Sequence, residues 1–180
     1  LPLATTEGAL VASVNRGCKA LTTGSGVKTE SQYHGISRSI AFTCSKGKDA
    51  CETLVREHEA EWKEEAHATS DHLKLLDYDI DLSDGFLFLT LKGDTDEAMG
   101  MNMITIAAQA TGMWIEKNVE GLRLLTVAGN VDSDKKPSLR TYERGRGYEV
   151  FAEATLSEKV LSEVLKTTSR DMIAVAKAKL

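Results

Sequence analysis

The segment with the clearest chemical potential is the polar run "GNVDSDKKP" at residues 129–137. In this run Asp134 precedes Lys135 and Lys136, so a lysine ammonium lies beside a carboxylate that can hold it in place. An ammonium held in this way can stabilise a developing oxyanion. The alternative is a solvated surface turn, which is the usual role of such a triplet. A glycine and a proline bound the run, which favours a more defined loop than most.

A second candidate is Glu7 in "ATTEG", at the start of a helix predicted over residues 6–21. The helix dipole favours a carboxylate in the first helical turn, so simple stabilisation is one interpretation. A role in proton transfer requires instead that this carboxylate be buried next to a suitable partner.

The third candidate is "EAMGMNMI" at residues 97–104, which reads as the start of another helix. Gly100 costs roughly 1 kcal/mol relative to Ala in a helix interior, so packing alone does not explain it. A helix N-terminus that contains a glycine lets backbone N–H groups approach a phosphate. The alternative is a Met-rich helix face that fills an irregular core. The run is not the G-x-G-x-x-G fingerprint, so a Rossmann domain is not predicted.

The composition is that of an ordinary globular protein and excludes several classes of function. The chain has 180 residues, a net charge of -5 and 42% hydrophobic residues, which predict one domain or one domain with an insertion. Without a basic surface, binding to nucleic acid is not predicted. No apolar run approaches the roughly 20 residues of a membrane span, and we find no signal peptide. Cys18, Cys44 and Cys51 are odd in number and fit no zinc spacing, so buried free thiols in a reducing compartment are predicted.

The elements that position the candidate residues alternate between strands and helices. The patterns predict, in order, a strand at 37–44, a helix opening at Asp49, an alternating strand at 75–82, a strand at 86–91, a helix at 95–118 and a strand at 122–128. This β-α-β-β-α-β order is that of the split βαβ, ferredoxin-like sandwich. A strand at 147–154 and a helix from Ser157 follow. The predicted fold class is therefore α+β, with a ferredoxin-like domain inserted into a mixed helical and strand unit built from both flanks.

Four segments occur in one order along the chain: "TTEGALVASVNRGCKA", "EAMGMNMI", "GNVDSDKKP" and "VLKTT". Together they resemble class I 3-hydroxy-3-methylglutaryl-coenzyme A (HMG-CoA) reductase over essentially the whole chain. The resemblance implies reduction of HMG-CoA to mevalonate and CoA by two hydride transfers from NADPH, or from NADH, without a metal. It also implies a large substrate domain beginning at 1–39, a small NAD(P)-binding domain at 40–126, and the catalytic-lysine loop and continuation of the large domain at 127–180.

The resemblance also assigns roles to particular residues. Glu7 resembles the proton-donating glutamate of the family, and Lys135 resembles the lysine that stabilises the substrate oxyanion. The residues that resemble those around the hydroxymethylglutaryl carboxylate and the lysine are Arg38, Asp134 and Lys136. The residues that resemble the CoA contacts are Ser13, Asn15, Arg16, Lys19 and Lys166. The residues that resemble the dinucleotide contacts are Ser70, Asp71, Glu97, Ala98, Met99, Gly100, Met101 and Asn102.

Three positions depart from the family pattern. Glu97 stands where the family usually has Asp, so a carboxylate remains but is one methylene longer. Ala128 stands where the family usually has Ser, which removes a hydroxyl worth about 0.5–1.5 kcal/mol as a net hydrogen bond. Asp71 stands where the family usually has Arg for the 2′-phosphate of NADPH. Because a carboxylate repels phosphate but accepts a hydrogen bond from a ribose hydroxyl, better use of NADH is predicted. Lys74, one helical turn away, is the alternative partner for that phosphate.

The catalytic aspartate and histidine of the family are expected beyond Leu180, so these 180 residues are expected to be a piece of a longer protein and inactive alone. The longer protein is expected to form a homodimer or homotetramer, in the cytoplasm or on the cytosolic face of the endoplasmic reticulum. One alternative is a non-catalytic relative that binds nucleotide or CoA, or regulates. The other is a ferredoxin-like interaction domain whose motif matches are accidental.

Overall fold

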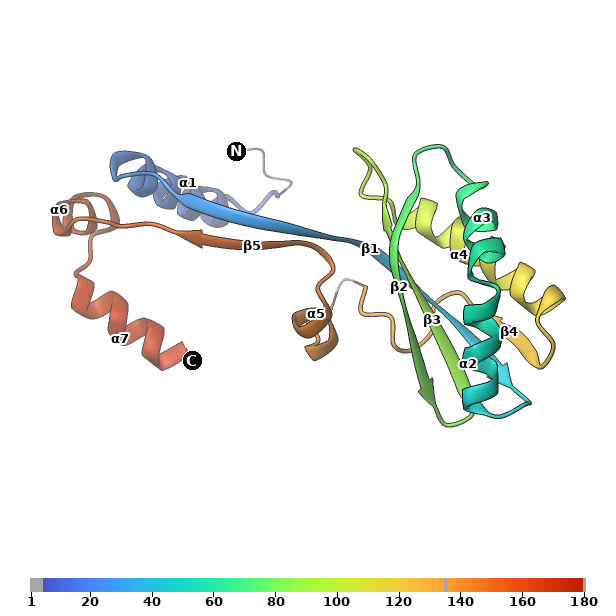
Figure 1. Ribbon diagram of the computed structural model, residues 1–180. Helices are drawn as coiled ribbons and strands as arrows, with labels where there is room; N and C mark the ends of the chain where they lie inside the picture. Colours follow the sequence, from blue (N-terminus) through green and yellow to red (C-terminus); the bar gives the residue numbers. More distant parts are fainter. Residues whose placement is uncertain (1–4, 135, 180) are drawn as a thin grey trace. The chain divides into compact units, whose positions relative to one another are not determined.

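The computed structural model describes residues 5–134 and 136–179 and divides by packing into two compact units (Figure 1). One unit, here the flank unit, consists of Leu1–Ser31 and Val150–Leu180. The other, here the sheet unit, consists of Gln32–Glu149. The chain passes from one unit to the other within β1 and again within β5. Each unit is described by itself below.

The sheet unit is built on four antiparallel strands in the spatial order β2-β3-β1-β4. Their bounds are Lys28–Cys44 for β1, Lys74–Ser83 for β2, Phe86–Asp94 for β3 and Leu122–Thr126 for β4. β2 and β3 form a hairpin through the turn at residues 84–85, where Asp84 and Gly85 both have positive φ. Along the chain the elements follow the predicted β-α-β-β-α-β order. The fold is thus α+β with an antiparallel sheet.

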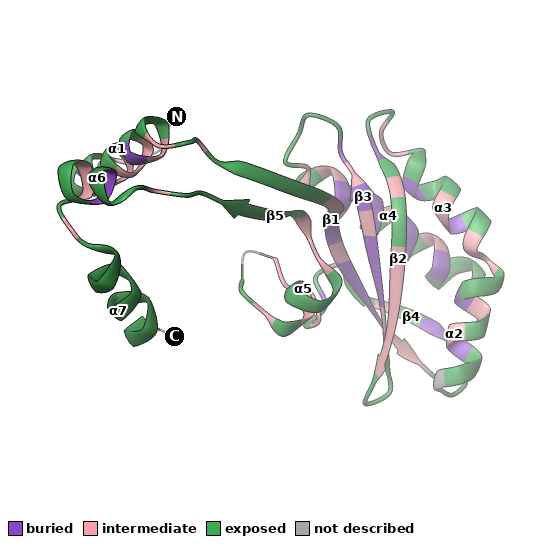
Figure 2. Cartoon of the chain, turned by 60° about the vertical axis from the view of Figure 1, so that its left-hand side comes forward, coloured by how far each residue is buried: buried purple, intermediate pink, exposed green. Residues whose placement is uncertain are grey.

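Three helices cover one face of this sheet (Figure 2). They are α2 at Lys48–Glu57, α3 at Glu59–His67 and α4 at Met101–Asn118. The alternating apolar residues of the central strands point into this layer, where Ile40, Phe42 and Leu89 are fully buried. Trp62 of α3 is also fully buried, and its indole N–H donates to the carbonyl oxygen of Val55 at 2.9 Å. Its polar atom is therefore satisfied inside the core.

The structure corrects the bounds of three predicted elements. β1 begins at Lys28, well before the predicted residue 37. The prediction missed its first residues because they are polar and exposed and show no alternation of apolar and polar side chains. The helix expected through residues 49–66 is split in two at His58. The helix expected from Thr95 begins only at Met101, because Gly100 has φ +85° and ends the preceding turn.

A short helix that the sequence did not predict, α5 at Leu139–Arg144, lies on the opposite side of the sheet from α2 to α4 (Figures 1 and 2). Ser138 caps it by accepting a hydrogen bond from the backbone N–H of Thr141. A helix therefore follows the predicted polar loop directly, and Ser138, the residue after Pro137, is its start signal.

Arginines of α5 bind the acidic face of β2. Arg140 lies 2.7 Å from Asp81 and 3.4 Å from Asp79, and Arg144 lies 3.1 Å from Asp81. Lys92 on β3 adds a third cation, 3.1 Å from Asp79. Although burial opposes the charge of Arg144, Asp81 and Asp79 raise its pKa above the usual value.

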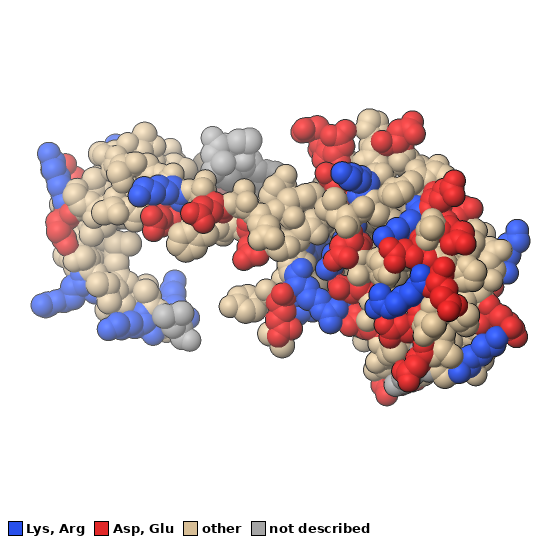
Figure 3. Space-filling view, viewed as in Figure 1, with Lys and Arg blue, Asp and Glu red and all other residues tan. Residues whose placement is uncertain are grey.

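Asp77, the third aspartate of this alternating strand, lies 3.7 Å from Lys92, so all three aspartates are paired with cations. Figure 3 shows acidic and basic side chains interleaved on the visible face of this unit.

The prediction of free thiols is wrong for two of the three cysteines. Cys44, at the end of β1, and Cys51, in the first turn of α2, form a disulfide with their Cα atoms 6.3 Å apart. The turn between the two elements brings the residues together, and their sequence spacing does not reveal that turn. Cys18 on α1 is free and half-buried.

The flank unit contains α1 at Gly8–Thr23, the first residues of β1, most of β5 (Gly147–Glu153), α6 at Glu158–Val160, the π-helix η1 at Leu161–Leu165, and α7 at Ser169–Lys179. β5 pairs with β1. α1 packs against η1, and its Ala20 is buried. Gly24 allows a close approach, since a Cβ there would lie 3.2 Å from the side chain of Leu156. The final helix predicted from Ser157 is interrupted at residues 166–168 and resumes as α7.

The functional division at residues 39/40 and 126/127 stays a prediction, because packing alone does not show which part binds which ligand. In the described part of the chain, no helix is both long enough and apolar enough to cross a membrane.

Gly100 provides a test of the turn that precedes α4. A Cβ on Gly100 would lie 2.1 Å from Thr95 Oγ1, whereas a Cβ on Gly85, also at φ +85°, would meet nothing within 4 Å. An L-residue in the left-handed region costs roughly 1–2 kcal/mol, and an overpacked site adds about 1–3 kcal/mol. We therefore expect Gly100→Ala to lower the unfolding free energy by about 2–4 kcal/mol and Gly85→Ala by about 1–2 kcal/mol, measured by urea denaturation. Equal losses in the two variants would contradict the packing described for Thr95.

Candidate functional site

The polar loop that follows β4 is held on the sheet by its first residue. The backbone N–H of Gly129 donates to the carbonyl oxygen of Ser39 on β1 at 2.8 Å. A Cβ at Gly129 would lie 2.9 Å from the ring of Phe88 and 3.3 Å from Ala41, so only glycine lets the loop pack this closely. Farther along, a carboxylate oxygen of Asp132 accepts from the backbone N–H of Asp134 at 3.1 Å. The loop therefore has a defined start and an internal turn of its own.

Arg38 on β1 pairs with the carboxylates of this loop. Its Nη1 lies 3.2 Å from Asp132 Oδ2 and 4.0 Å from Asp134 Oδ2. The three side chains are 19%, 7% and 20% exposed, respectively, so these charges are largely withdrawn from water. Within the described residues, the buried Nε of Arg38 has no hydrogen-bond partner. The structure thus brings together two predicted substrate residues, Arg38 and Asp134, that lie almost a hundred residues apart.

A hollow of about 260 Å³ opens beside this pair. It is lined by Arg38, Ala128, Gly129, Asn130, Asp132, Asp134 and Lys136. The predicted substrate residue Lys136 therefore shares a surface depression with Arg38. A guanidinium and an ammonium at one hollow can bind a small carboxylate, because both donate charge-assisted hydrogen bonds. The predicted catalytic Lys135 falls outside the described residues.

The second region of interest surrounds the start of α4. The first bond within this helix runs from the backbone N–H of Ile104 to the carbonyl oxygen of Gly100 at 2.9 Å. The amides of Met101, Asn102 and Met103 precede it and have no acceptor within the helix. No side chain caps them in the described structure. They form a group of donors with the polarity that binds phosphate.

The predicted dinucleotide residues Ser70 and Asp71 lie in the turn after α3, and this turn is linked to the segment before α4. Ser70 Oγ accepts from the backbone N–H of His72 at 3.2 Å. His72 Nδ1 lies 3.2 Å from Asp96 Oδ2, and both side chains are exposed. Two segments that the sequence assigned to one ligand are therefore neighbours in space.

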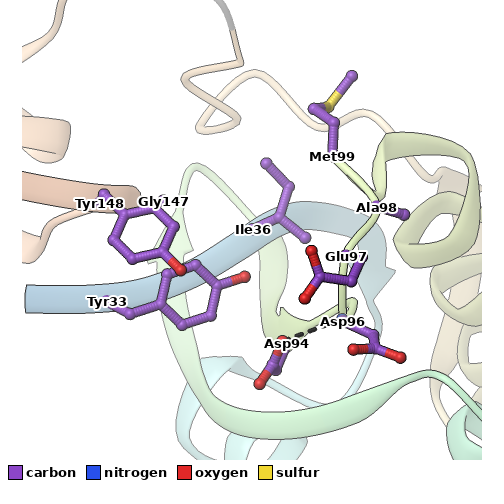
Figure 4. A pocket seen from close by; sticks show the side chains of 9 residues that line it. All are labelled: Tyr33, Ile36, Asp94, Asp96, Glu97, Ala98, Met99, Gly147 and Tyr148. Carbon is purple, nitrogen blue, oxygen red and sulfur yellow. Dashed lines mark hydrogen bonds between the residues drawn. The ribbon is translucent and has the colours of Figure 1, made fainter.

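A pocket of about 450 Å³ adjoins the segment before α4 (Figure 4). It is lined by Tyr33, Ile36, Asp94, Asp96, Glu97, Ala98, Met99, Gly147 and Tyr148. The rings of Tyr33 and Tyr148 lie with their centroids 4.6 Å apart on one side, and the carboxylates lie across from them. Predicted dinucleotide residues, Glu97 to Met99, thus form part of a real depression. The two tyrosines were missed, because neither belongs to a motif.

The electrostatics of this pocket favour neutral and donor groups. Burial raises the pKa of Tyr33, and the charge of Asp94 and the presence of Tyr148 raise it further. Carboxylates only accept hydrogen bonds when ionised, so Asp94, Asp96 and Glu97 suit hydroxyl or amide donors on a ligand. In the described residues, no group of three or more His, Cys, Asp or Glu side chains is arranged to hold a metal ion.

The remaining predicted residues lie in the flank unit. Glu7 is the N-cap of α1 rather than a first-turn residue, since the helix begins at Gly8, and its side chain is exposed and makes no capping bond. The predicted CoA residues of α1 are all exposed and are Ser13, Asn15, Arg16 and Lys19. Lys166, also exposed, ends η1 with φ +58°. Because α1 packs against η1, both predicted CoA segments belong to one unit. That Glu7 and Lys135 converge on one carbonyl stays a prediction.

The chain is similar to known proteins over most or all of its length. A family model described as hydroxymethylglutaryl-coenzyme A reductase matches residues 1–180. The chain is 40% identical over 171 residues to 3-hydroxy-3-methylglutaryl-coenzyme A reductase of Pyrococcus abyssi, a match that covers 93% of this chain and 42% of the relative. It is 39% identical over 186 residues to the enzyme of the same name from Methanocaldococcus jannaschii, covering 99% of this chain and 46% of the relative. The chain thus spans less than half the length of these curated relatives.

Solved structures show a similar fold. 3-Hydroxy-3-methylglutaryl-coenzyme A reductase from Streptococcus pneumoniae matches with a TM-score of 0.70 and 18% identity, over 96% of this chain and 39% of that chain. A class II enzyme from the same organism, in open conformations with NADPH bound, matches with a TM-score of 0.68 and 19% identity, over 93% of this chain and 38% of that chain. At such identities the likeness shows the fold alone.

The raised pKa of Tyr33 predicts how stability changes at high pH. The folded protein holds the phenol proton more tightly than the unfolded chain does, so this contribution is complete below the unfolded value near 10. It is lost as the pH rises through the folded value. We expect the unfolding free energy of the Tyr33→Phe variant to fall less steeply above about pH 10 than that of the wild type. Asp94→Asn should have an effect in the same direction, because it removes a charge that opposes the phenolate. Parallel pH profiles for all three proteins, from denaturant unfolding, would contradict this electrostatic account of the pocket.

Proposed function

Since this chain belongs to the hydroxymethylglutaryl-coenzyme A reductase family, we propose that the protein reduces HMG-CoA to mevalonate and CoA with a nicotinamide cofactor. The observation that carries the proposal is the meeting of Arg38, Asp134 and Lys136 at one hollow, next to the position of Lys135 in the chain. These four residues come from two distant segments and carry the charges that a carboxylate-bearing thioester requires. The match to the family model over residues 1–180 supports the same proposal independently of this geometry.

The substrate carboxylate would bind at the hollow beside Arg38. Arg38 and Lys136 are the cations that line it, and Asp134, which lies 4.0 Å from Arg38, directly precedes Lys135 in the sequence. In this arrangement the ammonium of Lys135 would stabilise the oxyanion that forms at the thioester carbonyl, and again at the hemithioacetal and aldehyde. Glu7 would supply the proton. CoA would bind the exposed residues of α1, with Lys166 pairing a phosphate.

The nicotinamide cofactor would bind along the segment from Asp94 to Asn102. The strand order β2-β3-β1-β4 supports a ferredoxin-like domain as the binding domain for this cofactor. The unpaired amides at the start of α4 would receive a phosphate of the dinucleotide, and Gly100 keeps the backbone open to it. Glu97, at the pocket of Figure 4, would accept from a ribose hydroxyl. When bound, the cofactor supplies the hydride for both reduction steps. The NADPH bound to one of the solved neighbours supports a dinucleotide for this chain as well.

The second candidate function is a non-catalytic binding module. Substitution of Lys135 distinguishes this function from that of an enzyme. In the whole protein, Lys135→Ala should lower kcat about 10²–10³-fold, because it removes the group that stabilises the oxyanion. The affinity for HMG-CoA should change far less. Lys117→Ala, at an exposed position on α4, is the matched control and should leave both quantities unchanged. A protein that binds HMG-CoA but shows no Lys135-dependent turnover would be a binding module.

Cofactor preference is the second test, and it follows from the acidic surroundings of Ser70. Asp71 and Asp96 place carboxylates near the expected 2′ position, and Lys74 is exposed but is the first residue of β2 rather than a residue one helical turn away. We expect kcat/KM with NADH to be comparable to, or greater than, that with NADPH. Asp71→Arg should raise the NADPH/NADH ratio of kcat/KM by about tenfold or more, since it adds a phosphate partner and removes a repulsive charge.

Glu65→Arg is the matched control for Asp71→Arg, because it makes the same change of charge at an exposed position on α3. It should leave the ratio unchanged. A strong preference of the wild type for NADPH would refute the role given to Asp71 while leaving the reductase proposal intact.

A further inference from the structure

Arg146, which no motif singled out, connects three parts of the sheet unit. Its Nε donates to Ser37 Oγ on β1 at 3.0 Å. Its Nη2 lies 3.1 Å from Asp134 Oδ1 in the polar loop and 3.0 Å from the Sδ of Met101, the first residue of α4. The side chain is 13% exposed, so these contacts are shielded from water. The guanidinium therefore lies where the predicted substrate loop and the predicted cofactor helix meet.

The backbone on both sides of Arg146 is set in an unusual conformation. Gly145 and Gly147 have φ +67° and φ +66°. A Cβ at Gly145 would lie 2.3 Å from the ring of His34, and His34 is itself paired with Glu149 at 2.8 Å. Left-handed conformations of this kind strongly favour glycine. The two glycines thus fix the path of the chain as it leaves α5.

The three contacts use the shape of a guanidinium as well as its charge. Nε and Nη2 lie on one edge of a rigid plane and donate in fixed directions, whereas a lysine ammonium is a single point on a flexible stem. Asp134 lies between two arginines, with Oδ1 at Arg146 and Oδ2 toward Arg38 at 4.0 Å. Arg146 therefore sets the orientation of the carboxylate that directly precedes Lys135.

We propose that Arg146 is a positioning residue that holds the Lys135 loop in register with the start of α4, so that hydride donor and thioester carbonyl are aligned. This role rests on the proposed function. Arg146 acts through Asp134 and Met101, and it has no contact of its own with the reacting atoms. Its loss would misplace the two ligands relative to each other, and such misplacement lowers turnover more than it lowers the affinity for either ligand.

The test compares variants of the whole protein by steady-state kinetics. Arg146→Ala should lower kcat about 10–100-fold, with KM for HMG-CoA and for the cofactor each changed less than about threefold. Guanidinium chloride at low millimolar concentration should restore part of this kcat by filling the vacated site, whereas methylammonium should not. Arg123→Ala, at an exposed position on β4, is the control and should neither lose activity nor respond to guanidinium.

Two results would overturn the proposal: wild-type kcat in Arg146→Ala, or a loss of kcat that guanidinium does not relieve in a variant with unchanged thermal unfolding. If Arg146→Ala does not fold, Arg146→Lys decides the matter. It keeps the charge but not the planar fork, so its kcat should still fall about tenfold, and wild-type kcat in this variant would refute the role. A wild-type protein that binds but does not reduce HMG-CoA would instead overturn the proposed function, and with it this role.

Discussion

The geometry of the candidate substrate site depends on a row of alternating carboxylates and guanidinium groups: Asp132, Arg38, Asp134 and Arg146. Their side chains are all 20% exposed or less. Withdrawing such charges from water is costly unless each has an oppositely charged partner with good geometry. Because Arg38 and Asp134 are each shared by two neighbours, displacing either of them takes a charged partner from two other members of the row. The loop that carries Asp134 is therefore held in one conformation, because separating these largely buried ion pairs costs free energy.

The sheet supports this row by using its two faces differently. One face is apolar and holds the helices through Trp62, Ile40 and Leu89. The other is polar and holds the loop at both ends: Gly129 packs on Phe88, and the α5 arginines bind Asp79 and Asp81. The loop therefore spans two fixed points on one rigid sheet. A scaffold of this kind gives a polar loop the precision that its own sequence cannot supply.

Patterns within single elements were predictable, whereas contacts between elements were not. The alternation in β2 predicted the faces of residues 77–82, because side chains of a strand point to opposite sides with period two. It did not predict the register shift between Leu75 and Asp77, and Leu76, which was expected on the apolar face, is exposed. It could not show that Arg140 and Arg144 would cover the aspartates, since these residues lie about sixty positions away in a segment without helical periodicity. The α4 start was predicted six residues too early because the sequence does not reveal that Gly100 takes a positive φ. The Cys44–Cys51 disulfide was missed because the sequence does not reveal the turn between β1 and α2 that brings the two cysteines together.

Site residues that belong to a motif were predicted, whereas site residues that matter only through their contacts were not. The resemblance selected Arg38, Asp134 and Lys136 from motifs, and the structure places them at one hollow. Arg146 and Tyr33 were not found, since their importance lies only in what they touch. Arg146 is nonetheless marked in the sequence by its two flanking glycines, "GRG", a signal that gains meaning only with the φ angles in view.

The candidate cofactor region contains two features of opposite charge, the amides at the start of α4 and the carboxylates of the neighbouring pocket. Because they lie at different places along the segment, they restrict which ligands the region can bind. The amides at the start of α4 carry partial positive charge and favour a phosphate. A few residues earlier, Asp94, Asp96 and Glu97 crowd the neighbouring pocket with negative charge. A ligand with its phosphate on the helix and its neutral, donor-rich groups in the pocket satisfies both features. A ligand that placed a second phosphate among the carboxylates would satisfy only one. The region is therefore complementary to a molecule whose negative charge is concentrated at one point along its length.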